Sequence, residues 1–218
     1  MLTLINISFK NILKNLTLAV KPGEFLVIVG ANGTGKTTLF NVISGAISPK
    51  NGKIIINGDD ITNVPQYKRS RKISSVVQDP KCGTVGEMTI LENMNIAYMR
   101  KRYVKNSRRI IDYFKEKLSV LEIGLENRLN EYVRNLSGGQ RQALSLVMAT
   151  LADYDLLLLD ELTAALDPKT SDMVMEMTNR IVSHEKKTCL LITHNTKYMS
   201  SFGDRTLEMK DGALMKLA

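Results

Sequence analysis

A strand-like segment at 25–29 leads into the pattern Gly-x-x-x-x-Gly-Lys-Thr, which runs from Gly30 to Thr37. A helix-like segment begins at Lys36, so the pattern lies between a strand and a helix, as a phosphate-binding loop requires. Glycines allow backbone N–H groups to turn toward phosphate oxygens, and the start of the helix adds positive potential. These residues predict a nucleotide site in which Lys36 contacts the β- and γ-phosphates and the Thr37 hydroxyl binds Mg²⁺.

Two carboxylates follow a run of four leucines at 156–159. The leucines are typical of a strand buried on both faces of a parallel sheet, whereas Asp160 and Glu161 come where that strand ends. Ligands of open α/β sheets bind outside the carboxyl ends of the strands. We therefore expect Asp160 to hold Mg²⁺, and Glu161 to orient and deprotonate an attacking water.

Two more strand-like segments end in polar residues, because 73–77 leads into Gln78 and 190–193 leads into His194. Gln78 can bind Mg²⁺ or the attacking water, and His194 can hydrogen-bond the γ-phosphate as charge develops. Alone, each residue is more often an ordinary exposed amide or a loop histidine. The neighbouring motifs favour catalytic roles for both, whereas His184, in a polar helix end, is expected on the surface.

A second glycine-rich loop, Leu136-Ser137-Gly138-Gly139-Gln140, opens a helix-like segment farther along the chain. Its backbone N–H groups could also bind a phosphate, and the first loop does not need these additional donors to bind its own nucleotide. The simplest use of this loop is a second nucleotide contact, made across a dimer.

Composition limits the class of protein. The chain has 218 residues, 44% of them hydrophobic, and a net charge of +8. It contains no apolar run long enough for a membrane span and no secretory signal at its start, so we expect a soluble cytosolic protein. Cys82 and Cys189 lie far apart without ligand-like spacing, which predicts neither a disulfide nor a zinc site.

The positive charge is concentrated in two clusters, one at 68–72 and one at 100–109. Such clusters are usually solvated faces, but a face close to anionic lipid head groups fits as well. Nucleic-acid binding would require interleaved aromatic residues, of which Tyr98 and Tyr103 alone are near the second cluster. We expect no nucleic-acid partner and leave the first two interpretations open.

Periodicity predicts an α/β domain, because apolar strand-like runs alternate with helical patterns. The stretch 87–151 is mostly helical and predicts an insert within a single domain over 1–218. An Asp211-Gly212 turn predicts a closing hairpin. We expect antiparallel strands at 2–8 and 16–20, strands of the buried parallel type at 25–29, 53–57, 73–78, 156–159 and 189–193, helices at 36–44, 138–151 and 168–183, and hairpin strands at 205–209 and 213–217.

Together these motifs resemble the nucleotide-binding domain of the ATP-binding-cassette (ABC) family, over nearly the whole chain and in the family's order. The resemblance implies an α/β, P-loop NTPase (RecA-like) core with a mostly parallel sheet, N-terminal antiparallel strands and a helical insert. It also implies ATP hydrolysis with Mg²⁺. It also implies that the subunits form a head-to-tail homodimer when ATP binds. Each nucleotide would lie between one subunit's Walker A loop, 30–37, and the other subunit's signature loop, 136–140.

The resemblance carries roles onto matching residues. Phe9 falls where the family places an aromatic that stacks on adenine, although a core phenylalanine fits equally. Glu161, His194 and Gln78 would be catalytic, and Thr37, Gln78 and Asp160 would bind Mg²⁺. The ATP-binding set is Gly30, Asn32, Gly33, Thr34, Gly35, Lys36, Thr37 and Thr38; the signature acting in trans is Ser137, Gly138, Gly139 and Gln140; and the D-loop, Ala164-Ala165-Leu166-Asp167, contributes Asp167.

Within the family, the chain looks like the ATPase subunit of bacterial importers, in a branch associated with tryptophan/tyrosine-type substrate-binding proteins. The resemblance implies a subunit on the inner face of the cell membrane that works with transmembrane permease subunits and an extracytoplasmic substrate-binding protein. A groove near 78–99 would receive the permease. The chain departs from the commoner pattern at Met148, usually arginine, and at Leu162, usually proline. This placement within the family rests on the sequence segments 65–69, Gln78-Asp79-Pro80 with Gly83-Thr84, 88–90 and 142–150.

Two other hypotheses fit the motifs less well. A non-transport ABC-type ATPase of DNA repair or chromosome structure would have a long coiled coil, and a translation factor would usually join two cassettes. A regulatory module without catalysis would be expected to lack Lys36 or Glu161, and both are present.

Overall fold

The computed structural model describes residues 1–99, 108–164, 166–185, 187–195 and 203–216. The chain forms two compact units, one of 1–75, 154–161 and 185–218, the other of 76–153 and 162–184. The predicted single domain with an insert over 87–151 stays a prediction, and the second unit is wider than that insert. Three predicted features lie outside the described ranges. They are residues 100–107 of the second basic cluster together with Tyr103, the D-loop residue Ala165, and the hairpin end at Leu217.

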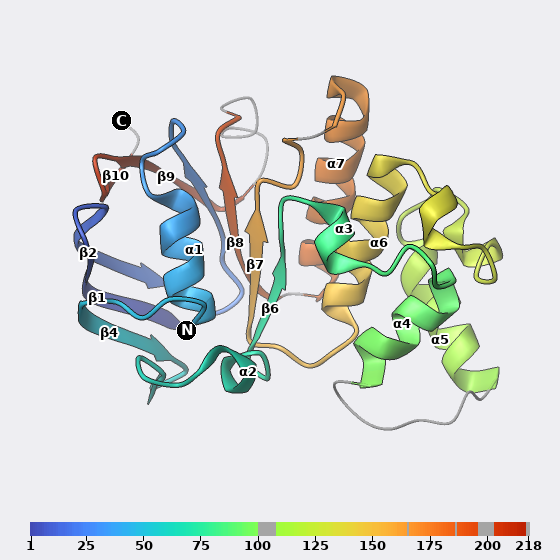
Figure 1. Ribbon diagram of the computed structural model, residues 1–218, viewed down its shortest axis with the longest axis horizontal. Helices are drawn as coiled ribbons and strands as arrows, with labels where there is room; N and C mark the ends of the chain where they lie inside the picture. The colour runs from blue at the N-terminus through green and yellow to red at the C-terminus, as the bar shows by residue number, and fades with distance from the viewer. Residues whose placement is uncertain (100–107, 165, 186, 196–202, 217–218) are drawn as a thin grey trace. The chain divides into compact units, whose positions relative to one another are not determined.

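The larger sheet of the first unit carries the buried strands (Figure 1). Its strand order is β10-β9-β3-β8-β7-β6, with β3 parallel to β8 and β9, and β7 parallel to β8. Every residue of β3, β7 and β8 is buried, as continuous apolar runs in a parallel sheet predict. The strands are β3 (Phe25–Val29), β6 (Ile73–Val76), β7 (Leu156–Asp160), β8 (Thr188–Thr193), β9 (Arg205–Lys210) and β10 (Ala213–Lys216).

A smaller antiparallel sheet in the same unit has the order β2-β1-β4-β5. The prediction of a parallel-type strand at 53–57 is wrong, because β4 pairs antiparallel with β1. Three consecutive isoleucines resemble a strand buried on both faces, but Ile54 and Ile56 are buried while Ile55 is part-exposed. The strands are β1 (Leu2–Phe9), β2 (Leu13–Val20), β4 (Asn51–Ile56) and β5 (Asp59–Asp60).

Two helices and the closing hairpin complete the first unit. Helix α1 (Lys36–Ser44) lies next to β7 and β8, and α2 (Gln66–Arg69) precedes β6. The hairpin of β9 and β10 turns at Asp211 and Gly212, whose φ angles are 50° and 81°. Positive φ at both turn residues matches the twist of the strands, which confirms the predicted turn.

The second unit is mostly helical. Helix α5 buries Ile110, Phe114 and Leu118, which recur at a spacing of four residues. Helix α6 lies next to α3, α4 and α5. No helix among the described residues is both long and apolar enough to cross a membrane. The elements are α3 (Pro80–Gly83), α4 (Ile90–Met99), α5 (Arg108–Ser119), the 3₁₀ turns η1 (Leu125–Asn127) and η2 (Val133–Asn135), α6 (Gly138–Thr150) and α7 (Pro168–Glu185).

Candidate nucleotide-binding and catalytic site

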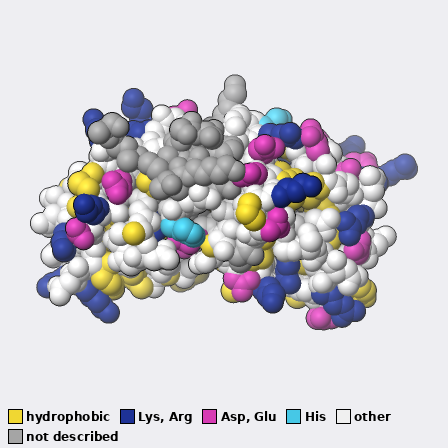
Figure 2. Space-filling model, turned by 90° about the horizontal axis from the view of Figure 1, so that it is seen from above, with side chains coloured by type: hydrophobic (Ala, Val, Ile, Leu, Met, Phe, Trp, Pro, Cys, Tyr) yellow, Lys and Arg dark blue, Asp and Glu magenta, His cyan; other side chains and the backbone are white. Residues whose placement is uncertain are grey.

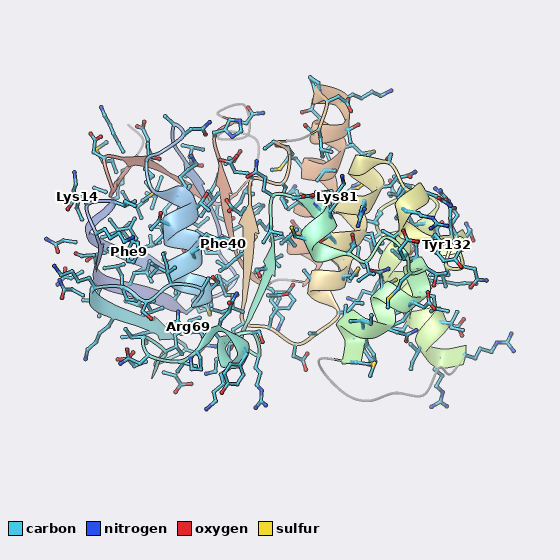
Figure 3. The ribbon with its side chains drawn as sticks, in the orientation of Figure 1. Phe9, Lys14, Phe40, Arg69, Lys81 and Tyr132 are labelled. Atoms are coloured by element: carbon cyan, nitrogen blue, oxygen red, sulfur yellow. The ribbon has the colours of Figure 1, made fainter. Side chains whose placement is uncertain are left out.

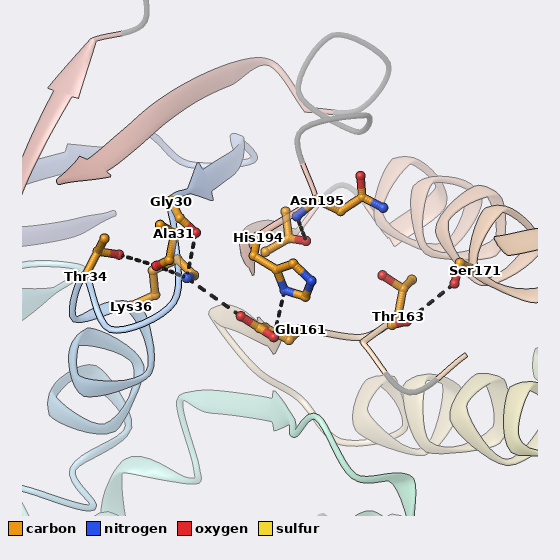
Figure 4. Close-up of polar contacts among 10 residues, drawn as sticks. Gly30, Ala31, Thr34, Lys36, Glu161, Thr163, Ser171, His194 and Asn195 are labelled. Carbon is orange, nitrogen blue, oxygen red and sulfur yellow. Dashed lines mark hydrogen bonds and ion pairs between the residues drawn. The ribbon is translucent and has the colours of Figure 1, made fainter. Parts of the chain in front are cut away.

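The loop from Gly30 to Thr37 joins β3 to α1 as the sequence predicts (Figure 4). Lys36 is 4% exposed, and its Nζ donates hydrogen bonds to the carbonyl oxygens of Gly30, at 2.8 Å, and Ala31, at 2.9 Å. The ammonium group is thus held at the loop by carbonyl oxygens. Asn32 and Thr37 are exposed, so their side chains are open to a ligand.

Two glycines of this loop are fixed by geometry. Gly35 caps α1 with a φ of 105°, a left-handed conformation that residues with a side chain rarely adopt. At Gly30, a Cβ atom would lie 2.4 Å from the carbonyl oxygen of Met209 in β9. The loop therefore passes too close to β9 for a side chain at Gly30.

Strand pairing brings Glu161 and His194 together. Asp160 pairs with Ile192 in the β7–β8 register, and the Glu161 N–H donates to the Ile192 carbonyl at 2.8 Å. His194 follows β8 directly, and its Nδ1 lies 3.0 Å from Glu161 Oε2. The other carboxylate oxygen, Oε1, lies 3.7 Å from Lys36 Nζ. Glu161 thus contacts both residues, as Figure 4 shows.

Asp160 is a buried carboxylate at the same strand end. Its side chain is 6% exposed, and its Oδ1 is buried without a hydrogen-bond partner among the described residues. Burial and the neighbouring Glu161 carboxylate raise the pKa of Asp160 to about 6, although Lys36 opposes that rise. An unpartnered buried carboxylate oxygen suits a hard cation such as Mg²⁺, which prefers oxygen ligands. Among the described residues, no three His, Cys, Asp or Glu side chains are arranged to hold a metal ion, so a site here would also draw on hydroxyl or amide oxygens.

The Ser137 loop belongs to the second unit and opens α6. The Ser137 hydroxyl accepts from the Gln140 N–H at 3.2 Å, and Gln140 Oε1 accepts from the Ser137 N–H at 3.1 Å. This reciprocal capping box fixes the start of the helix. A Cβ at Gly139 would lie 2.1 Å from Thr170 Cγ2, so a side chain there would displace Thr170, while Ser137 and Gly138 are exposed.

The remaining predicted residues lie at element ends. Gln78, two residues after β6, is exposed. Asp167 accepts a hydrogen bond from the Thr170 N–H at 3.1 Å, and hydrogen bonds from Thr170 lower the pKa of Asp167. Phe9 ends β1 with the Lys10 ammonium 5.3 Å from its ring centre, and Figure 3 places it on the antiparallel sheet. His184 is exposed, as predicted.

Sequence reasoning missed the position of Arg69, which it placed in a basic cluster of the kind that is usually solvated. The side chain is 2% exposed, and it donates to the carbonyl oxygens of Val42 and Ile43 in α1 and of Thr62 and Val64. Lys68 and Arg71 are exposed. On the face in Figure 2, Lys and Arg side chains are scattered among Asp and Glu side chains. A charge run alone did not distinguish the buried arginine from its exposed neighbours.

Comparison with known proteins agrees with this geometry. The family model described as ABC transporter matches residues 13–164. This chain belongs to the ABC transporter family. It is an ABC ATPase subunit, and the fold and ATP-hydrolysing activity predicted from its motifs are confirmed.

Relatives of this ABC ATPase include transport proteins. The tyrosine transport ATP-binding protein of Clostridioides difficile (strain R20291) is 43% identical over 208 residues, which cover 94% of this chain and 82% of the relative. The carnitine transport ATP-binding protein OpuCA of Listeria monocytogenes serotype 1/2a is 33% identical over 207 residues. That match covers 95% of this chain but 51% of OpuCA, so this chain spans about half of that relative.

Solved structures of ABC ATPases match the whole chain. A dimeric ATP-binding cassette in a post-hydrolysis state, bound to ADP and phosphate, is 28% identical. Its TM-score is 0.83, and the match covers 100% of this chain and 99% of the other. Cassettes of this family bind ATP, form dimers and work with transmembrane permease components.

Proposed function

We propose that this chain is the ATP-hydrolysing subunit of a bacterial importer, and that it couples ATP-driven dimer closure to solute entry through a separate permease. The contact of Glu161 with Lys36 and His194 at the end of the parallel strands carries the proposal. Similarity to the tyrosine transport ATP-binding protein supports a role in transport and makes tyrosine the first solute to test. The permease would place the subunit at the cytoplasmic face of the membrane.

The proposed chemistry centres on residues of the first unit. Lys36 binds the β- and γ-phosphates, and Thr37 and Asp160 would hold Mg²⁺, which would neutralise phosphate charge. Glu161 accepts a proton from water as the water oxygen attacks the γ-phosphorus. The bond from that phosphorus to the bridging oxygen breaks, which gives ADP and phosphate. His194 orients the Glu161 carboxylate through its hydrogen bond.

The Ser137 loop acts on the nucleotide of a second subunit in this proposal. Its exposed Ser137 and Gly138 open a helix of 13 residues, whose N-terminus favours a phosphate. The similar cassette bound to ADP and phosphate is dimeric, which supports this arrangement. ATP binding then closes the homodimer, and hydrolysis opens it.

Exposed apolar residues of the second unit support a docking face for the permease. Val85, Ile96, Met99 and Tyr132 are between 44% and 49% exposed. The Arg134 guanidinium lies 5.0 Å from the centre of the Tyr132 ring, and Figure 3 labels Tyr132 in this unit. We assign these residues to contacts with a permease segment that presents apolar side chains. An extracytoplasmic substrate-binding protein would deliver the solute to that permease.

Uptake by cells that lack this chain tests the proposal. Cells complemented with the wild type should accumulate labelled tyrosine, whereas cells with Glu161→Gln should not. Glu176→Gln, a change at an exposed glutamate of α7, is the matched control and should restore uptake. If purified protein hydrolyses ATP but uptake of tyrosine and other amino acids is equal in all strains, the proposal of amino-acid import is wrong. A non-transport ABC-type ATPase would then be the better hypothesis.

A further inference from the structure

The segment 79–89, which connects Gln78 to α4, is fastened to the signature helix α6. Thr84 is 7% exposed at the end of α3. Arg141 of α6 donates from Nε to Thr84 Oγ1 at 2.6 Å and from Nη2 to the Thr84 carbonyl oxygen at 3.1 Å. The guanidinium thus holds one residue at two points, a geometry that its rigid fork of donors favours.

Further hydrogen bonds connect Thr84 to Pro80 and Arg141 to Ser137. The Thr84 hydroxyl donates to the Pro80 carbonyl oxygen at 2.8 Å, so its lone pairs can accept from Arg141. The Arg141 backbone N–H donates to the Ser137 carbonyl oxygen at 2.9 Å. A continuous hydrogen-bonded path therefore leads from Pro80, two residues after Gln78, to Ser137.

Packing and backbone hydrogen bonds fasten the same segment at two other places. A Cβ at Gly83 would lie 2.4 Å from Ser145 Oγ in α6, so α3 and α6 are in close contact there. The N–H groups of Val133 and Arg134 donate to the carbonyl oxygens of Met88 and Gly86, each at 3.0 Å. Val133 and Arg134 precede the signature loop, and Arg141 and Ser145 of α6 follow it. The segment thus contacts the chain on both sides of the signature loop.

We propose that Arg141 is a positioning residue, which acts through Thr84 to fix the signature loop relative to the segment that leaves Gln78. Displacement of that segment would then move Ser137 with it. Loss of the Arg141–Thr84 contact would leave ATP binding to Lys36 unchanged and weaken the contact of Ser137 with the second subunit's nucleotide. The inference rests on the proposed action of Ser137 across a dimer.

Paired substitutions at Thr84 test this role. Thr84→Val keeps the shape of the side chain but removes the hydroxyl, whereas Thr84→Ser keeps the hydroxyl. Arg141→Gln removes the other partner of the Arg141–Thr84 contact. Because Arg141 is part-exposed, this variant can still test the contact if Thr84→Val does not fold. Arg180→Gln is the control, because it removes an arginine whose ion pair with Glu122, at 2.5 Å, lies in the same unit.

The measurement is the ATP concentration that gives half-maximal dimer formation, with each change made in the Glu161→Gln protein. ATP affinity of the monomer and the melting temperature are measured beside it. Thr84→Val and Arg141→Gln should raise the half-maximal ATP concentration about tenfold, as expected for one lost charge-assisted hydrogen bond. Monomer ATP affinity should stay unchanged, Thr84→Ser should restore dimer formation, and Arg180→Gln should have no effect.

Three results would overturn the inference and can be told apart. Dimer formation by every variant at the same ATP concentration removes the positioning role of Arg141 and leaves the proposed function intact. Absence of dimers in the Glu161→Gln protein itself, despite ATP binding, removes the trans action of Ser137 and the inference with it. A lower melting temperature without a change in half-maximal ATP concentration makes the contact structural, which also contradicts the inference.

Discussion

Glu161 Oε2 lies 3.0 Å from His194 Nδ1, although 33 residues separate the two in sequence. Parallel pairing of β7 with β8 causes this contact, because Asp160 is opposite Ile192 and each functional residue follows its strand. A carboxylate can only accept, so Nδ1 of the imidazole carries the proton in this hydrogen bond. The sheet register therefore orients the proposed base before any nucleotide binds.

Replacement of His194 tests that orientation. His194→Ala should lower the ATP turnover number by about 10- to 100-fold, the range expected when a group that orients a catalytic base is lost. Binding of ATP should change little, because Lys36 keeps its contacts. His184→Ala, at an exposed histidine of α7, is the control in the same steady-state assay and should retain full turnover. Equal turnover of the two variants would remove His194 from catalysis.

Asp160 gives the protein without nucleotide a pH dependence of stability. Its folded pKa of about 6 is above the unfolded value, so its contribution is present below about pH 4 and is lost as the pH rises through 6. Asp160→Asn should therefore be more stable than the wild type at pH 7, by on the order of 1–2 kcal/mol after solvent screening. Urea unfolding at pH 4 and pH 7 measures the difference, which should vanish at pH 4. An unchanged difference between the two pH values would contradict the raised pKa.

Lys36 is expected to dominate nucleotide binding. Lys36→Ala should weaken ATP affinity by at least about 100-fold, because the loop loses its phosphate-contacting ammonium group. Lys14→Ala, at an exposed lysine of β2 that Figure 3 labels, removes the same charge elsewhere in the unit and should bind ATP normally. Calorimetric titration of both variants decides between a specific contact and a general effect of positive charge.

Arg69 is expected to stabilise the first unit. Arg69→Met leaves carbonyl oxygens at the end of α1 without a donor, which should cost about 3 kcal/mol in the free energy of unfolding. Arg71→Met, two residues away and exposed, should cost less than about 0.5 kcal/mol. Chemical unfolding of both variants gives the comparison, and equal costs would mean that the buried hydrogen bonds of Arg69 contribute little.

The sequence was most informative where a local pattern determines local structure. The apolar runs at 25–29 and 156–159 predicted buried strands, and Asp211-Gly212 predicted the turn. The motif from Gly30 to Thr37 predicted the strand–loop–helix arrangement that the structure has. Each of these features depends on residues that are adjacent in the chain, so one sequence is sufficient.

Features that depend on distant partners were not predictable in the same way. The isoleucines of β4 have the apolar character of a parallel strand, and only their pairing with β1 shows that alternate residues are buried. The burial of Arg69 depends on carbonyl groups of α1, and the Arg141–Thr84 contact spans 57 residues. No local pattern records which donor meets which acceptor across such separations.

Dimer formation by Glu161→Gln tests the central claim most directly. Size-exclusion chromatography with light scattering, run with and without MgATP, gives the mass of the protein in each condition. The account predicts a monomer without ATP and a dimer with ATP, because the variant binds nucleotide but does not hydrolyse it. A monomer at an ATP concentration that demonstrably saturates Lys36 would contradict the composite site between the phosphate loop and Ser137.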